Sequence, residues 1–355
     1  MILFLILTFC ILSHSPLSLA YASLGLELWL NKMVPSLLPF MILSGIMVRL
    51  NLTEKLAGAV YPVIGPVYRV RRNVVYCMAL GFLCGFPMGA KVTADLYERD
   101  MLSRREAEYL LAFCNNIGPV YFCSFVLPLL GRRLVLPYLF GMYGIPLLYG
   151  LALRRTAFRD LGLPVSPELR SCSAASAGTF PGLFRRNQSR RHTWQPLRQR
   201  SQGIGRQRLP SQQAGGQSFR QRTQEADRQV SDGLLSAVNE SVQASLQSIL
   251  TLGGYMILFN LLNLPLHILF GKEPALFAPL LEITGGLSML GEGLPLFSLL
   301  ALAFGGLSCI AQTYSCISTT DLEIGSYIRH KMILTLLCGG FYLSWFLVSP
   351  SSFLL

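Results

Sequence analysis

The sequence predicts an all-α polytopic membrane protein, and its composition supplies the reasons. Only 14% of the 355 residues are charged, against about 25% in soluble globular domains, and the mean hydropathy is +0.47. The 32 glycines and 20 prolines are scattered through apolar runs rather than polar ones, which excludes a disordered chain or a coiled coil as the main architecture. From the lengths of the apolar runs we expect about eight to ten membrane segments.

The net charge of +12 is concentrated in one loop. Residues 154–228 hold 15 arginines and four acidic residues, and their Arg, Gln, Ser and Gly content predicts a disordered linker over 154–232. Because arginine-rich loops are retained on the cytoplasmic side, we expect this linker in the cytoplasm. It divides a first membrane repeat, 1–153, from a second, 233–355. It lacks a basic helix face and interleaved aromatic residues, so we expect no nucleic-acid partner, and a topogenic or anionic-lipid role is favoured.

The first 30 residues have two interpretations. They carry a single charge, Glu27, and Ala20-Tyr21-Ala22 resembles a signal-peptide cleavage site. However, the first basic residue is Lys32, so the basic region that opens a signal peptide is missing. We favour a retained membrane segment.

The remaining elements are apolar helices, several of them interrupted. Two proline-containing stretches are shorter than the ~20 residues that a crossing needs and predict re-entrant or tilted half-helices. Two longer stretches contain breaks at Gly85-Phe86-Pro87-Met88-Gly89 and at Asn115-Asn116 with Gly118-Pro119. The expected segments are 34–48, 56–68, 74–94, 110–130 and 134–153 in the first half, and 242–270, 274–290, 294–320 and 332–355 in the second, where Trp345 is a candidate interfacial anchor.

A weak internal repeat relates the two halves. The segment 85–91, GFPMGAK, and the segment 306–312, GLSCIAQ, each interrupt an apolar run, and Gly, Ala and a long polar residue recur at the same offsets. We therefore expect two repeats of inverted topology, with re-entrant and broken helices.

Paired breaks are the best sequence indication of a substrate site. A helix broken inside a bilayer leaves backbone groups unpaired at a cost of several kcal/mol each, so breaks persist where they line a cavity. Half-helix N-termini attract anions and unwound carbonyls attract cations. The alternative is that the glycines only allow close helix packing. The candidate substrate-binding residues are Gly85, Pro87, Gly89, Lys91, Asn115, Asn116, Gly306, Ser308 and Gln312.

Two charged residues carry specific hypotheses. Lys91 follows the first break and is the first candidate for the counter-charge of an anionic substrate, although Asp95 and Glu98 show that the chain soon reaches water, so snorkelling is the alternative. Glu282, alone in an apolar run, either binds a coupling Na⁺ or H⁺ or fixes a helix by hydrogen bonding. The amides of Asn115 and Asn116 offer donors and acceptors to a solute.

No pattern indicates an enzyme, a metal site or a cofactor. The nine cysteines never form CxxC, so neither a zinc site nor a disulfide framework follows. Ser-His-Asp, HExxH and P-loop patterns are absent, and the four histidines lie away from the breaks. We expect a non-enzymatic protein without metal or cofactor.

The chain resembles a known family at these same positions. Trp29 with VPSLLPF at 34–40, GFPxGAK at 85–91, FCNN at 113–116, LEITxG at 281–286 and FGGLS at 304–308 with Gln312 look like the YlbJ-type sporulation integral membrane proteins. That family belongs to the nucleoside-recognition (Gate) superfamily and is similar to concentrative nucleoside transporters. The resemblance extends over residues 26–143 and 238–347.

The resemblance implies a stage V sporulation transporter in the outer forespore membrane of an endospore-forming bacterium. It would move dipicolinic acid, a small aromatic dianion, out of the mother cell. Two alternatives stay open, namely a cation-coupled carrier for nucleosides or other small solutes, and a non-transporting membrane assembly factor for sporulation.

Overall fold

The structure, a computed structural model, describes residues 2–50, 52–131, 134–161 and 215–349, which are helical and contain no strand. The chain divides into one unit of residues 1–162 and 233–355 and a second of residues 163–232. In the second unit the described residues, 215–232, are the first part of helix α13 (Gly215–Leu261). Much of the expected linker therefore lies outside the described residues. Its last part is helical, because Gln, Arg, Glu and Ala there favour helix.

Among the described residues, five helices are long and apolar enough to cross a membrane: Ser15–Arg49, Val135–Arg155, Gly233–Phe270, Pro295–Ile317 and Ile324–Val348. This is fewer than the membrane segments expected from the sequence. Helices α4 to α7 have only 10 to 16 residues each, too few to cross alone. Residues 34–48 are no half-helix, because the π-turn Trp29–Met33 carries α2 into α3 despite the prolines.

The first half begins with a short helix, α1 (Ile2–Ser13), and the long run of α2 (Ser15–Leu28), the π-turn and α3 (Val34–Arg49). Four short helices follow, with one break between α5 and α6 and another after α7. Their bounds are α4 Thr53–Tyr68, α5 Arg72–Cys84, α6 Met88–Glu98 and α7 Arg104–Phe113. After the α7–α8 break come α8 Pro119–Tyr121, a second π-turn at Phe122–Val126, α9 Leu127–Leu130, α10 Val135–Leu139, a third π-turn at Phe140–Gly144 and α11 Ile145–Arg155.

The second half repeats this order with fewer pieces. The part of α13 from Gly233 onward is followed by α14 (Asn263–Phe270), the pair α15 (Ala278–Leu281) and α16 (Ile283–Leu290), the pair α17 (Pro295–Phe304) and α18 (Gly306–Ile317), and the long α19 (Ile324–Val348). In element order, the α5–α6 break corresponds to the α15–α16 break, and the α7–α8 break to the α17–α18 break. By element order, the segments 85–91 and 306–312 therefore stand at different breaks, and the internal repeat stays a prediction.

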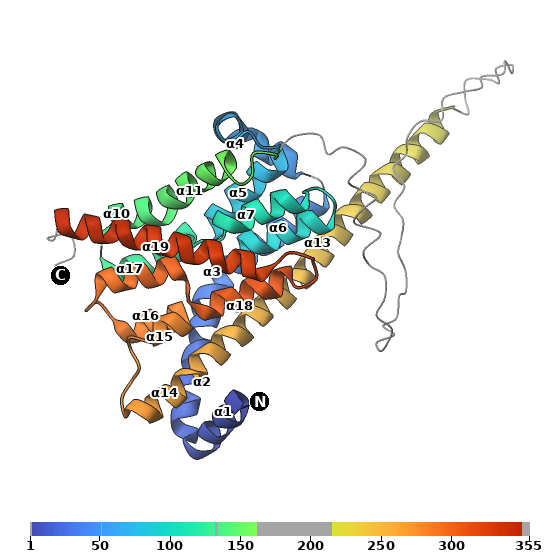
Figure 1. Ribbon diagram of the computed structural model, residues 1–355. Coiled ribbons are helices and arrows are strands. Elements are labelled where there is room, and N and C mark those ends of the chain that lie inside the picture. The colour runs from blue at the N-terminus through green and yellow to red at the C-terminus, as the bar shows by residue number, and fades with distance from the viewer. Residues whose placement is uncertain (1, 51, 132–133, 162–214, 350–355) are drawn as a thin grey trace, which may run out of the picture. The chain divides into compact units, whose positions relative to one another are not determined.

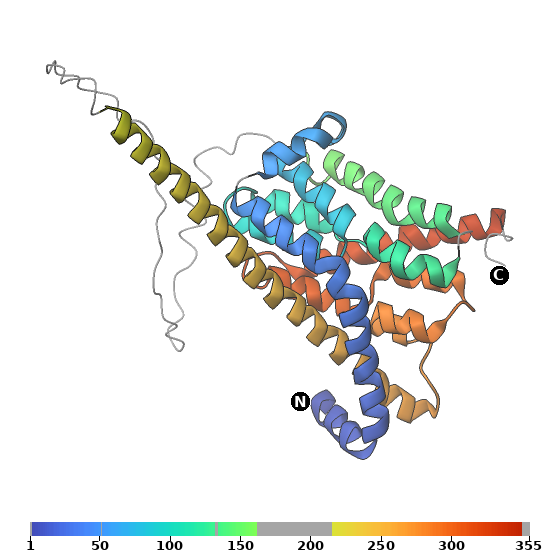
Figure 2. The same ribbon diagram turned by 180° about the vertical axis from the view of Figure 1, so that it is seen from behind.

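The first long helix of each half packs against the other in antiparallel fashion (Figures 1 and 2). A Cβ atom at Gly25 would lie 2.9 Å from the Cα of Ile257, and one at Gly45 would lie 3.2 Å from the side chain of Ser241. Between these points the indole Nε1 of Trp29 donates a hydrogen bond of 2.9 Å to a carbonyl of α13. Small residues thus let the two backbones approach closely, as membrane helices require.

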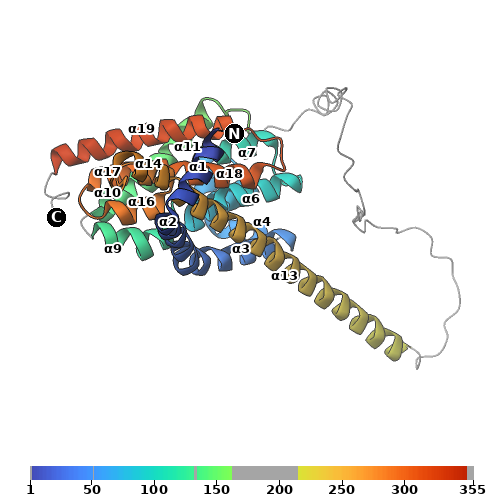
Figure 3. The ribbon, with the colours of Figure 1, turned by 90° about the horizontal axis from the view of Figure 1, so that it is seen from below.

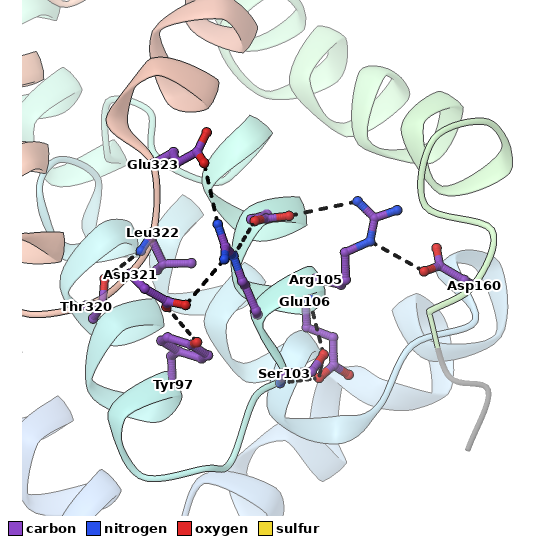
Figure 4. A network of polar contacts seen from close by, with 11 residues as sticks. Tyr97, Ser103, Arg105, Glu106, Asp160, Thr320, Asp321, Leu322 and Glu323 are labelled. Carbon is purple, nitrogen blue, oxygen red and sulfur yellow. Dashed lines mark hydrogen bonds and ion pairs between the residues drawn. The ribbon is translucent and has the colours of Figure 1, made fainter. Parts of the chain in front are cut away.

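The breaks lie between these helices and α19. Seen from below, α6 and α18 lie between α19 and α3 (Figure 3), and α6 contacts α3 and α18 directly. At one end of the bundle, Arg104 at the start of α7 pairs with Asp321 (3.4 Å) and Glu323 (3.6 Å) of the loop before α19, and Tyr97 donates to Asp321 at 2.7 Å (Figure 4). These polar contacts join the two halves where the helices end.

Candidate functional site

The breaks at α5–α6 and α7–α8 pack backbone against backbone. A Cβ atom at Gly85 would lie 2.2 Å from the backbone nitrogen of Gly118, and one at Gly89 would lie 2.7 Å from the carbonyl oxygen of Cys114. Gly85 also has φ +79°, a conformation that glycine adopts without steric cost. The predicted site residues Gly85 and Gly89 thus hold the two breaks together, as the packing interpretation expected.

The breaks of the second half form an equivalent pair. Glu282 separates α15 from α16, and Gly305 separates α17 from α18. A Cβ atom at Gly306 would lie 3.2 Å from the carbonyl oxygen of Pro279, and one at Gly305 would lie 2.6 Å from the ring of Phe86. The Phe86 ring, at the first break, therefore contacts the second pair, and all four breaks lie in one region.

The two asparagines at the α7–α8 break are buried and turn in different directions. Asn115 Nδ2 donates to Thr313 Oγ1 of α18 at 2.8 Å and to the Tyr327 hydroxyl of α19 at 3.4 Å. Asn116 Nδ2 donates to the carbonyl of Phe113 at 2.6 Å. Asn115 Oδ1 is buried without a hydrogen-bond partner among the described residues. The first asparagine therefore joins the halves, and its amide oxygen remains available to another donor.

Glu282 caps the helix that follows it. Its carboxylate accepts hydrogen bonds from the backbone nitrogens of Thr284 (3.1 Å) and Gly285 (2.6 Å) and from Asn260 Nδ2 (3.2 Å), and the side chain is buried. This geometry favours the helix-fixing interpretation, and ion coupling stays a prediction. The chain's own carboxylate also occupies the N-terminus of α16, so this half-helix end is not open to an anionic solute.

Lys91 lines a polar cavity of about 290 Å³ together with Pro87, Gln312 and residues of α13. Its Nζ lies 3.1 Å from Asp95 Oδ1, one turn along α6, and its side chain is about a quarter exposed. The ion pair already balances the charge of Lys91. The cavity volume is near the lower end of the range for small-molecule sites, roughly 300–1,000 Å³.

A second, much smaller cavity of about 40 Å³ lies at the breaks themselves. Phe86, Tyr121, Glu282 and Gln312 are among its lining residues. Gln312 lines both cavities, and its Nε2 donates to Ser308 Oγ at 2.8 Å. The side chain of Gln312 therefore stands where the polar cavity meets the breaks.

Lys331 of α19 lies at the α7–α8 break and is absent from the candidate residues that the sequence indicated. It is only 2% exposed, and its Nζ lies 4.5 Å from the centre of the Phe86 ring. Its acceptors are distant, the carbonyl oxygen of Asn115 at 3.4 Å and Asn116 Oδ1 at 3.5 Å. None of the ion pairs among the described residues involves Lys331.

A signal for Lys331 was present in the sequence. The last segment was expected to start at Met332, which left Lys331 in a basic loop beside Arg329 and His330. The helix in fact begins at Ile324, so Lys331 lies about 10 Å inside it at 1.5 Å per residue. A predicted segment that began two helical turns earlier would have included Lys331 as a charged residue inside a membrane helix.

The structure thus brings the predicted residues of both halves together around the breaks. Gly85, Gly89 and Gly306 make the backbone contacts, Asn115, Asn116, Ser308 and Gln312 supply polar groups, and Pro87 and Lys91 line the larger cavity. No group of three or more His, Cys, Asp or Glu residues able to hold a metal ion occurs in the described part of the chain.

Apolar spans, helix breaks and buried polar groups between them define an all-α polytopic integral membrane protein. Over 118 residues the chain is 36% identical to the sporulation integral membrane protein YlbJ of Bacillus subtilis (strain 168). The match supports a YlbJ-type family. It covers 33% of this chain and 29% of that protein, so the chain spans less than a third of its relative's length. No family model matches the chain, and no solved structure matches it.

Proposed function

We propose that this protein is a sporulation membrane transporter for a small organic anion, and that the anion is dipicolinic acid. The observation that supports transport is the meeting of four helix breaks beside two cavities that share Gln312. Breaks inside a bilayer leave backbone groups to be satisfied by other partners, and transporters use such breaks to build their substrate sites. The protein would move its solute without converting it chemically.

The similarity to YlbJ supports the sporulation setting. A transporter in the outer forespore membrane would receive dipicolinate from the mother cell, with both carboxylates ionised. The polar cavity beside Gln312 is about 290 Å³ in volume, which suits a small solute rather than a nucleotide or a peptide.

Flux through the purified protein tests the proposal. The full-length protein is reconstituted into liposomes, and uptake of labelled dipicolinate is compared with uptake of uridine and with protein-free liposomes. We expect saturable dipicolinate uptake above that of the protein-free liposomes. A variant without residues 163–214 should retain this uptake.

The other outcomes each reject the proposal in favour of an alternative. Uptake of uridine alone, dependent on Na⁺ or H⁺, would identify a cation-coupled solute carrier. Uptake of neither solute by a monodisperse protein, with loss of sporulation when residues 163–214 are deleted, would identify an assembly factor.

A further inference from the structure

The ammonium group of Lys331 is buried and forms no ion pair with any of the described residues. It is 2% exposed on a helix long and apolar enough to cross a membrane, and its two oxygen acceptors lie at 3.4 and 3.5 Å. A charge within a membrane helix is costly and normally faces a partner, a cavity or a substrate path. Here the described residues provide amide and carbonyl oxygens and an aromatic face but no carboxylate.

Lys91 differs in each respect. It is about a quarter exposed and already forms an ion pair with Asp95. A solute carboxylate at Lys91 would compete with Asp95, whereas one at Lys331 would meet no competing carboxylate within ion-pair distance among the described residues. Binding of a solute carboxylate is therefore more favourable at Lys331 than at Lys91.

The groups around Lys331 complete a carboxylate site. The α7–α8 break brings the carbonyl of Asn115 and the Oδ1 of Asn116 to the ammonium group. The Phe86 ring, at the tip of the α5–α6 hairpin, contacts both the ammonium group and the small cavity. That cavity holds about 40 Å³ and Lys331 is not among its lining residues. A typical small-molecule site is far larger, so a solute in this cavity would reach Lys331 only if the Phe86 ring moved.

We propose that Lys331 is the fixed positive charge of the substrate site, that its ammonium group binds the carboxylate of a small organic anion, and that the Phe86 ring covers it while the site is empty. This inference rests on the proposed transport function. It assigns the counter-charge to Lys331 of the second half, in place of Lys91 of the first.

Binding and thermal unfolding of detergent-purified full-length variants test the inference. Lys331→Met keeps the length of the side chain and removes its charge. We expect it to weaken dipicolinate binding by at least tenfold and to raise the Tm of the solute-free protein, because an uncompensated buried charge is removed. Lys272→Met, at an exposed lysine, is the matched control and should change neither quantity.

Two further variants separate a binding role from a structural one. Lys331→Arg keeps the charge and should retain part of the affinity that Lys331→Met loses. Phe86→Leu removes the aromatic face that competes for the ammonium group, so it should tighten binding several-fold.

The experiment distinguishes rejection of the Lys331 role from rejection of the proposed transport function. Wild-type affinity in Lys331→Met, or an unchanged or lower Tm, would overturn the role of Lys331 while leaving the function intact. Loss of affinity in Lys91→Met but not in Lys331→Met would return the counter-charge to Lys91. No binding of dipicolinate by the wild-type protein would reject the proposed function and the Lys331 site with it.

Discussion

Asn115 Nδ2 donates a hydrogen bond of 2.8 Å to Thr313 Oγ1, so one buried amide joins the broken helix of the first half to α18 of the second. The residues lie 198 positions apart in the sequence. Together with the contacts of Tyr97 and Arg104 to the loop before α19, this hydrogen bond contributes to the register in which the two halves meet, because buried polar groups need partners.

A double-mutant cycle on this pair measures the link. We expect Asn115→Leu to lower the free energy of unfolding by about 1–3 kcal/mol, since it removes a buried donor and introduces a branched apolar group. Thr313→Val should cost less, and the double variant should show a coupling of about 0.5–3 kcal/mol. Strict additivity would contradict the assignment of Asn115 as the link.

Gly118→Ala tests the backbone contact between the first two breaks. The new Cβ atom would lie 2.6 Å from the carbonyl oxygen of Cys84, a contact that backbone must move to relieve. We expect a loss of stability of about 1–3 kcal/mol and loss of dipicolinate binding, measured by thermal unfolding and titration.

The matched control for that variant is Gly58→Ala. No heavy atom lies within 4 Å of a Cβ atom at Gly58, which is inside helix α4. This substitution should be neutral or should stabilise the protein by up to about 1 kcal/mol. A similar loss in both variants would show that Gly118 has no special steric role.

Glu282→Gln separates helix capping from ion coupling. The carboxylate accepts from two backbone nitrogens and one amide, and glutamine offers one acceptor oxygen where glutamate offers two. We expect the Tm to fall, equivalent to about 1–3 kcal/mol, with transport per folded molecule unchanged. Abolished transport at an unchanged Tm would instead assign Glu282 to ion coupling.

Glu106 should make stability depend on pH. Burial raises the pKa of its carboxyl, but hydrogen bonds from the Arg71 guanidinium and from Ser103 outweigh burial, so the pKa lies below its usual value. A lowered folded-state pKa gives stability that is present above the unfolded pKa of about 4.3 and is lost as pH falls through the folded value.

The pH dependence can be measured by comparing the wild type with Glu106→Gln. At neutral pH the variant should be less stable by about 1–3 kcal/mol, a range kept low because the partner, Arg71, is 55% exposed. The interval from about pH 5 to pH 3 brackets the unfolded pKa. Over this interval the Tm of the wild type should fall further than the Tm of the variant. Parallel Tm curves would contradict a lowered pKa.

The sequence by itself predicted the class of protein and most of the positions that matter. Low charge and long apolar runs determine a helical membrane protein, because a continuous apolar run of about 20 residues crosses a bilayer as a helix that satisfies its own backbone hydrogen bonds. The breaks at Gly85 and Asn115 were evident for the same reason, since Gly, Pro and Asn interrupt apolar helices locally. These signals lie within one or two helical turns and need no knowledge of the fold.

Only the tertiary structure decided which of these residues meet. It brought the breaks of both halves into one region, where the Phe86 ring of the first break contacts Gly305 of the second half. It left Lys331 without a carboxylate within ion-pair distance among the described residues, whereas the Lys91–Asp95 pair is local to one helix turn. The energy of a buried charge depends on partners that the fold brings from distant segments, and for Lys331 the asparagine acceptors lie more than 200 residues earlier in the chain.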